Sequence, residues 1–376
     1  MKEGWEYKTL GEVAKIIHGK NQKDVLSDDG KYPIYGSGGN IMGYSKEYLC
    51  TAGTTILGRK GSINNPFFIE ENFWNVDTAF GISAKDNYSS KFIFYYCKSK
   101  DWNKLNTGTT LPSLTQSVVK SQIIAVPSYD EQRRIVSYLD SSFKLIDEIK
   151  NKALKSLTEA KALFQSALSE AMEPKEGWEE KTLGECCDKI NGLWKGKKPP
   201  FIYVGVIRNA NFTKKMTLDF SNIEYLDVEV KQYNSRKLKR GDLIIEKSGG
   251  SEKQPVGRAV LFLKGDGEYS FSNFTSVLRI KNNEELNYYF LYYFLLYIYQ
   301  RGDTKTMQKA TTGIHNIEFE KYLNIKIPIM SLNEQRRIVS YLDKLSSKVR
   351  AIEEKYQKMV EECDALKQAM LRDVFE

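Results

Sequence analysis

Long apolar runs, paired cysteines and clustered histidines are all missing from this 376-residue sequence. No run reaches the roughly 18 apolar residues of a membrane-spanning helix, and the N-terminal residues lack the apolar core of a signal peptide. The five cysteines have no CxxC spacing, which disfavours a disulfide framework or a zinc site. These absences favour a cytoplasmic protein with reduced thiols and no membrane partner.

Catalytic motifs are missing as well. The two histidines, His18 and His315, have no partners at the spacing of a triad or a metal site. There is no phosphate-binding G-x-x-x-x-G-K-[ST] loop. The Asn65–Phe68 segment lacks the second proline of an N-P-P-[FYW] methyltransferase signature, and Glu229–Lys231 is too loosely spaced from upstream acids for a nuclease site. We expect no catalytic residues and no metal ligands in this chain.

The composition is that of a folded, basic protein. Hydrophobic residues make up 41% and aromatic residues 12%, which excludes wholesale disorder, and the length allows two domains. The formal net charge of +8 favours a polyanionic partner.

An internal duplication dominates the chain. The ten-residue string EQRRIVSYLD occupies Glu131–Asp140 and returns at Glu334–Asp343, and the opening Lys2–Glu6 returns as Lys175–Glu179. The second copy is longer by about thirty residues, and the middles of the copies match only in pattern. The chain therefore consists of a constant frame that carries two different inserts.

Each copy of EQRRIVSYLD opens a heptad-patterned helix. From Ile338 onward the apolar spacing alternates four and three, which predicts a left-handed coiled coil, and smaller residues follow the same phase in the first copy. The expected seam residues are Leu139, Ile146, Ile149, Leu163, Leu342, Leu345, Val349, Ile352, Met359 and Leu366.

Connectivity favours pairing of the two helices within the chain. The first helix enters the second domain through the short linker Met172–Pro174, so pairing must be antiparallel, which predicts a dumbbell with pseudo-two-fold symmetry. The alternative is an exposed coil through which the chain dimerises with itself.

The segments before the helices predict two mixed α/β globular units and an overall α+β fold. We expect a first domain at 1–128, a central helix at 129–173, a second domain at 174–330 and a C-terminal helix at 331–376.

Glycine-containing basic loops are the best candidates for binding. Gly58–Ser62 follows a predicted strand and aligns with Glu246–Ser251, so that Arg59 corresponds to Lys247. Such loops approach phosphates or a DNA groove closely, and threonine-rich segments offer hydroxyl and backbone N–H donors to a duplex backbone. The predicted DNA-binding residues are Lys20, Lys23, Arg59, Lys60, Thr109, Thr110 and Ser113 in the first domain, and Lys195, Lys197, Lys198, Arg208, Lys247, Ser248, Thr311 and Thr312 in the second.

The chain resembles the specificity (S) subunits of type I restriction-modification systems over its whole length. The resemblance rests on the Gly-Trp-x-x-x-x-Leu-Gly-Glu openings at Gly4–Glu12 and Gly177–Glu185, and on the Glu-Gln-x-x-Ile-x-x-x-Leu helix entries after Pro127 and Pro328. It implies two target recognition domains, each reading half of a bipartite DNA site. The helices would set the half-site spacing and dock two methyltransferase (M) subunits.

The resemblance further implies that this chain carries no cofactor, since S-adenosylmethionine, ATP and Mg²⁺ belong to the M and restriction (R) partners. The protein would then be cytoplasmic, DNA-associated and bacterial or archaeal. Two alternatives remain from the residues alone, namely a self-contained methyltransferase or nuclease, and a purely structural coiled-coil adaptor.

Overall fold

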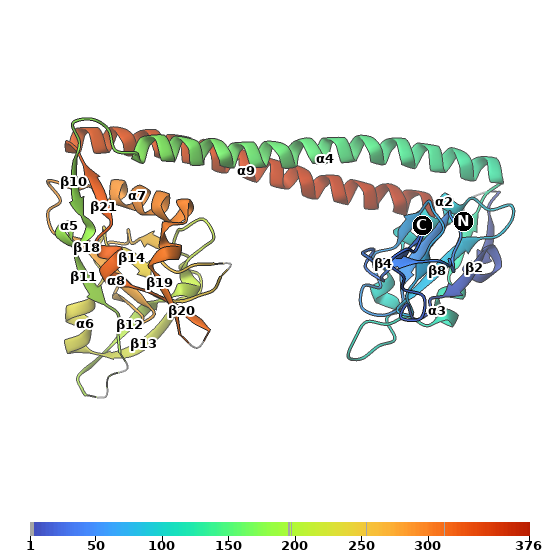
Figure 1. Ribbon diagram of the computed structural model, residues 1–376, viewed down its shortest axis with the longest axis horizontal. Helices are drawn as coiled ribbons and strands as arrows, with labels where there is room; N and C mark the ends of the chain where they lie inside the picture. Colours follow the sequence, from blue (N-terminus) through green and yellow to red (C-terminus); the bar gives the residue numbers. More distant parts are fainter. Residues whose placement is uncertain (1–3, 195, 197, 253, 312) are drawn as a thin grey trace. The chain divides into compact units, whose positions relative to one another are not determined.

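Two 44-residue helices, α4 (Tyr129–Met172) and α9 (Leu332–Phe375), are the longest elements of the computed structural model (Figure 1). The structure describes residues 4–194, 196, 198–252, 254–311 and 313–376. The chain divides into unit 1, Met1–Lys155 with Tyr356–Glu376, and unit 2, Ser156–Lys355. Each unit therefore contains one globular domain and one end of each long helix.

The globular domain of unit 1 combines short strands with short helices. Its strands are β1 (Glu6–Thr9), β2 (Ala14–His18), β3 (Tyr32–Tyr35), β4 (Ile41–Ser45), β5 (Thr54–Gly58), β6 (Phe67–Ile69), β7 (Trp74–Asn75), β8 (Ala79–Ala84) and β9 (Ile123–Val126). Its helices are α1 (Leu10–Val13), α2 (Ser90–Ser99), the 3-10 helix η1 (Trp102–Leu105) and α3 (Gln116–Lys120).

Three sheets organise this domain. An antiparallel four-stranded sheet has the order β2-β8-β5-β6, a three-stranded sheet has the order β4-β3-β7 with β3 parallel to β7, and β1 pairs with β9. All five residues of the central strand β5 are buried. Leu10, Phe80, Phe92, Trp102 and Ile124 join the four-stranded sheet to the helices in one core.

Unit 2 repeats this frame with additional elements. Its strands are β10 (Glu179–Thr182), β11 (Cys187–Asn191), β12 (Phe201–Ile207), β13 (Glu224–Glu229), β14 (Leu243–Glu246), β15 (Ser248–Gly250), β16 (Ala259–Leu261), β17 (Tyr269–Phe271), β18 (Thr275–Ile280), β19 (Gln308–Thr311), β20 (Ile314–Ile317) and β21 (Lys326–Ile329). Its helices are α5 (Leu183–Cys186), η2 (Asn209–Asn211), α6 (Val230–Arg236), α7 (Tyr288–Arg301), η3 (Asp303–Met307) and α8 (Phe319–Leu323).

The sheet orders of unit 2 match those of unit 1 strand by strand. The order β11-β18-β14-β16 corresponds to β2-β8-β5-β6, β13-β12-β17 corresponds to β4-β3-β7, and β10 pairs with β21 as β1 pairs with β9. The sheet β15-β20-β19 is the addition. The second copy therefore carries an additional sheet on a preserved frame.

The repeated Thr-Leu-Gly-Glu motif forms the N-terminal cap of a short helix in each unit. Glu12 Oε2 accepts hydrogen bonds from Thr9 N at 2.6 Å and Thr9 Oγ1 at 2.7 Å, and Glu185 makes the same two contacts with Thr182. These capping boxes satisfy donors at the start of α1 and α5. The bonds lower the pKa of both Glu12 and Glu185.

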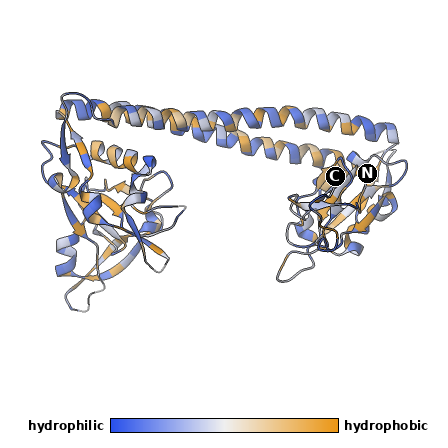
Figure 2. Ribbon diagram, viewed as in Figure 1, coloured by the Kyte–Doolittle hydropathy of each residue, from blue (hydrophilic) through white to orange (hydrophobic). Residues whose placement is uncertain are grey.

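Helix α7 is rich in aromatic residues and largely buried, and Figure 2 shows it as largely hydrophobic. Phe290, Leu291, Leu295 and Ile298 pack into the core of unit 2. In the described part of the chain, no helix is long and apolar enough to cross a membrane.

The long helices pack antiparallel on each other in unit 1. Lys150 Nζ lies 2.6 Å from Asp364 Oδ1, and Lys367 Nζ lies 2.5 Å from Asp147 Oδ1, so residue numbers rise along α4 as they fall along α9. In unit 2, Leu168 and Met172 of α4 share a core with Ile338 and Leu342 of α9. The prediction of an α+β fold with two domains and two long helices packed together is confirmed.

Burial corrects part of the predicted seam. Leu139, Ile146, Leu342 and Val349 are buried as expected, and Leu345 and Met359 are half-buried. The remaining four seam residues are exposed, and these are Ile149, Leu163, Ile352 and Leu366.

The buried row repeats every seven residues on α4, at Leu139, Ile146, Ala153, Ala160 and Ala167. Its neighbouring row lies one residue beyond the predicted one, and includes Lys150, whose side chain is 27% exposed. Lysine stems at this flank cover apolar surface while their amines reach aspartates. A hydrophobicity pattern misses such positions, which is why the second row was assigned to the wrong residues.

Candidate nucleic-acid interface

The basic loop and the threonine segment of unit 1 lie side by side. Arg59 N donates to Thr78 O at 2.8 Å, Leu114 N donates to Arg59 O at 2.9 Å, and Gly61 N donates to Pro112 O at 2.8 Å. Lys60 also forms an isolated bridge with Ser113. The two segments that the sequence singled out, about fifty residues apart, therefore form one continuous edge.

Asn106 shapes the threonine segment. Its Oδ1 accepts from Gly108 N and from Ser113 N, both at 2.8 Å. Thr109 and Thr110 are exposed on this loop, whereas Ser113 is half-buried and its hydroxyl donates to Leu111 O at 3.0 Å. The loop is thus held at its base and presents its two threonines to solvent.

The neighbouring basic side chains are unequally placed. Lys60 is exposed, and Arg59 is half-buried with Nη1 donating to Asp77 O at 2.9 Å. Lys20 is exposed and belongs to the same edge, because Gly19 N donates to Ala79 O and Lys20 N donates to Asn75 O, each at 3.0 Å. Lys23 is exposed in the following loop, where its amide donates to Asn21 Oδ1 at 3.0 Å.

A glycine at the end of the second strand brings this edge together in both units. A Cβ atom at Gly19 would lie 1.8 Å from Val76 O, and one at Gly192 would lie 1.9 Å from Ser272 O. Only glycine allows such close approach of two backbone segments. The two units therefore build the edge with the same backbone device.

Sequence reasoning missed the Gly36–Asn40 loop between β3 and β4. A Cβ atom at Gly38 would be 3.7 Å from both Asn40 Oδ1 and Ser62 Oγ, so this loop adjoins the Gly58–Ser62 loop. The available signal was a glycine-rich run, GSGGN, between two strand-like segments.

Lys247 occupies the position in unit 2 that Arg59 occupies in unit 1. Lys247 N donates to Phe274 O at 2.9 Å and Ile317 N donates to Lys247 O at 2.8 Å, which repeats the pattern of bonds around Arg59. The residues that follow diverge, since Lys60 is exposed whereas Ser248 is buried. The equivalence of Arg59 and Lys247 is structural, and their contact with DNA stays a prediction.

The other predicted residues of unit 2 are dispersed. Lys198 is exposed, and its amide donates to Glu229 Oε1 at 2.7 Å. Arg208 is half-buried and forms an ion pair with Glu224. Thr311 lies in β19. Lys195, Lys197 and Thr312 lie outside the described residues.

Two buried ion pairs support the edge of unit 2. Glu246, directly before Lys247, accepts from Arg258 Nε at 2.7 Å and Nη2 at 2.9 Å, and Asp242 accepts from Arg279 Nε at 2.8 Å and Nη2 at 2.7 Å. Hydrogen bonding to these carboxylates raises the pKa of both arginines. Such bidentate pairs hold the β14 strand end in a defined position.

Lys189 is a further cation that sequence reasoning missed. Its pKa is lowered by burial and then by the charge of Lys247. Its Nζ also lies 4.4 Å from the ring centroid of Phe319. Two like charges at one edge favour an anionic partner there.

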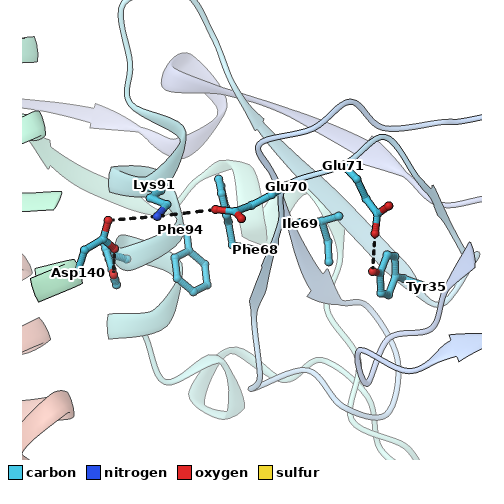
Figure 3. A pocket seen from close by; sticks show the side chains of 9 residues that line it. Tyr35, Phe68, Ile69, Glu70, Glu71, Lys91, Phe94 and Asp140 are labelled. Carbon is cyan, nitrogen blue, oxygen red and sulfur yellow. Dashed lines mark hydrogen bonds and ion pairs between the residues drawn. The ribbon is translucent and has the colours of Figure 1, made fainter. Parts of the chain in front are cut away.

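Each unit also has a cavity beside its aromatic helix. The cavity of unit 1 has a volume of about 500 Å³. Lys91 Nζ lies 3.1 Å from Asp140 Oδ2 and 3.8 Å from Glu70 Oε1 along one side of it, and Tyr35 Oη donates to Glu71 at 3.1 Å (Figure 3).

The cavity of unit 2, about 590 Å³, lies at the corresponding place, because it contains Tyr293 where the first contains Tyr95. Its lining is basic, with Lys161, Lys214, Lys215 and Arg350 among its residues. Arg59 does not line the first cavity and Lys247 does not line the second, although Arg258, the partner of Glu246, lines the second.

The repeated EQRRIVSYLD segment joins each long helix to its own domain. Gln335 is fully buried, and its amide accepts from Asn287 N at 2.8 Å and donates to Glu285 O at 2.7 Å and Met330 O at 2.9 Å. Gln132 is likewise buried, and accepts from Ser89 N at 2.9 Å.

The tyrosine–aspartate contact at the end of the segment also recurs. Tyr95 donates to Asp140 in unit 1, and Tyr293 donates to Asp343 at 2.6 Å in unit 2. Burial and then these hydrogen bonds raise the pKa of both tyrosines. The repeated glutamine and aspartate are therefore explained by anchoring within each unit.

The comparisons with known proteins agree with this duplicated frame. The family model described as type I restriction modification DNA specificity domain matches residues 2–159 and 175–362. A putative type I restriction enzyme specificity subunit of Haemophilus influenzae is 27% identical over 93% of this chain and 89% of its own length. The MjaVIII specificity subunit of Methanocaldococcus jannaschii is 25% identical over 92% of this chain and 87% of its own length.

Solved structures share the fold. A chain from a study of complex assembly and conformational transition of the type I R-M system matches with a TM-score of 0.77 and 20% identity, covering 99% of this chain and 97% of that chain. The HsdS subunit of Thermoanaerobacter tengcongensis matches with a TM-score of 0.55 and 20% identity, covering 100% and 97%. The chain belongs to the DNA specificity (S) subunit family of type I restriction-modification systems, a family of non-catalytic recognition subunits.

Proposed function

We propose that the two globular domains each read one half of an asymmetric bipartite DNA site, and that α4 and α9 set the spacing between the halves. The observation that carries this proposal is a preserved frame with divergent reading edges. Arg59 and Lys247 share a backbone position, while the loop beside Arg59 is replaced by a sheet beside Lys247. Different edges on one frame suit two different base sequences.

The helices are suited to setting a spacing. A 44-residue helix is about 66 Å long at 1.5 Å per residue. Symmetric DNA-binding proteins place their half-sites about one helical turn apart, and we infer that the bases between the two half-sites go unread here.

The exposed surface of the repeated segment is our candidate for docking M subunits. Arg133 and Arg134 are exposed, as are Arg336 and Arg337. The neighbouring Tyr138 is 57% exposed, and the matching Tyr341 is 54% exposed. Packing within the chain does not require these residues to be identical, whereas docking of the same partner on each copy does.

In this assembly the chain binds double-stranded DNA in the cytoplasm and holds no cofactor. S-adenosylmethionine would be carried by the M subunits, and ATP and Mg²⁺ by the R subunits. Access to an adenine inside the duplex would require base flipping by the M partner.

Exchange of one domain tests the proposal. Residues 1–128 are replaced by the corresponding domain of a relative, the hybrid is expressed with its M partner, and methylated positions are mapped across the host genome. We expect one half of the methylated motif to change and the other half to stay the same. An unchanged motif would favour the structural-adaptor alternative instead.

A further inference from the structure

The sheet β15-β20-β19 takes the place of a loop in unit 1, where the described residues 106–115 contain only the isolated bridge between Ser113 and Lys60. We propose that β19 and β20 form the base-reading ribbon of the second domain, which enters the major groove with Lys309 and Ile314 toward the base edges. This inference rests on the proposed function and assigns residues to one half-site.

The foot of the ribbon is anchored to the domain. Ile317 is buried, its amide donates to Lys247 O at 2.8 Å, and Gln308 Oε1 accepts from Val256 N at 3.3 Å. Glu318 N donates to Met307 O at 2.7 Å, which closes the same end. Figure 1 shows β20 on the side of its domain away from α9, where β12, β13 and α6 also lie. The ribbon therefore projects from a fixed base.

The strand register decides which side chains face outward. Lys309 pairs with Asn316, and Gln308 pairs with Ile317. Directly opposed residues share a face of a sheet and successive residues alternate. Because Ile317 is buried, Gln308 and His315 lie on the face toward the domain, whereas Lys309, Ile314 and Asn316 lie on the other face.

The outward face has the chemistry of base recognition. Lys309 is exposed and can donate to guanine O6 and N7. Ile314 is 44% exposed on this face. Its natural contact in a groove is the methyl group of thymine.

The width of the ribbon and the cations at its foot are compatible with insertion into the major groove. Paired strands lie about 4.8 Å apart, and the major groove of about 12 Å admits a two-stranded ribbon. The backbone carbonyl of Lys247 accepts the Ile317 bond at the foot of the ribbon. Lys189 Nζ lies 4.4 Å from the ring centroid of Phe319, which follows β20 in the chain. These cations would meet the phosphates that border the groove while the ribbon lies inside it.

Two point variants and a matched control test the assignment in the full-length chain. Lys309→Ala and Ile314→Thr alter the outward face, and threonine keeps a β-branched side chain in the strand. Lys305→Ala removes an exposed lysine from the adjacent η3 helix. Each protein selects duplexes from a random library, and the base preference at each position is measured by sequencing.

We expect Lys309→Ala and Ile314→Thr each to lose about tenfold or more of the discrimination at one to three adjacent positions of one half-site. Lys305→Ala should select the wild-type motif. A uniform loss of affinity with unchanged preferences, or no effect at all, would overturn the base-reading role. Failure of the wild-type chain to select any bipartite motif would instead refute the proposed function.

Discussion

The buried side chain of Gln335 makes three hydrogen bonds to backbone groups of the second unit. One amide group links the start of α9 to the backbone at Glu285, Asn287 and Met330. A buried backbone group that loses its partner retains the full desolvation cost, so one side chain has a large effect on stability.

We expect Gln335→Ala to lower the free energy of unfolding by about 2–4 kcal/mol, because three hydrogen bonds are lost and their buried partners are left unsatisfied. Urea unfolding of the full chain measures the change. The control is Gln368→Ala on the same helix, where the side chain is exposed and the expected change is below about 0.5 kcal/mol. Equal midpoints for the two variants would contradict the anchoring role.

The long helices contact each other through a row that repeats every seven residues. Alanines at 153, 160 and 167 in this row allow close approach of the two helix backbones. In the lysine–aspartate pairs at the flanks the aspartates are 59% and 54% exposed, so the pairs set register more than stability.

The same substitution at two positions of α4 tests which row is buried. Leu139 is fully buried and Leu163 is 58% exposed. Leu139→Ala should cost about 2–5 kcal/mol because it leaves a cavity, whereas Leu163→Ala should cost less than about 0.5 kcal/mol. Urea unfolding distinguishes them, and a large cost at Leu163 would restore the seam inferred from the heptad pattern.

The charge of the whole molecule bears on DNA binding. A net charge of +8, with cations at both reading edges, implies that phosphate contacts contribute much of the affinity. If six to ten phosphates are contacted, affinity for a duplex should fall by roughly 10³–10⁵ between 50 and 200 mM salt. Fluorescence anisotropy with a labelled duplex measures this dependence. An affinity that does not change with salt would contradict electrostatic binding by this chain.

At the level of the whole molecule, much of the architecture could be predicted without coordinates. The exact recurrence of EQRRIVSYLD established the duplication, and heptad spacing after it established two long helices. Both patterns can be recognised from short stretches of sequence, because helix periodicity depends on residues a few positions apart and the repeat is a string of ten identical residues. The equivalence of the Arg59 and Lys247 positions was found in the same way, by aligning one repeat with the other.

The candidate site was less predictable. The Gly36–Asn40 loop, Lys189 and the outward face of β20 were missed, because each gains its place from strand pairing across long sequence separations. Serine is common in loops, and the sequence around Ser248 resembles a loop. In the structure, however, Ser248 is buried in strand β15. Only tertiary packing determines such burial.

The sequence by itself therefore determined the duplicated frame, the two helices, the basic character and the family. The tertiary structure decided which helix faces meet, which cations share an edge, and that the second domain carries a ribbon where the first carries a loop. The physical reason is that periodicity and capping act over a few residues. Register and burial depend instead on partners that the chain brings together only when it folds.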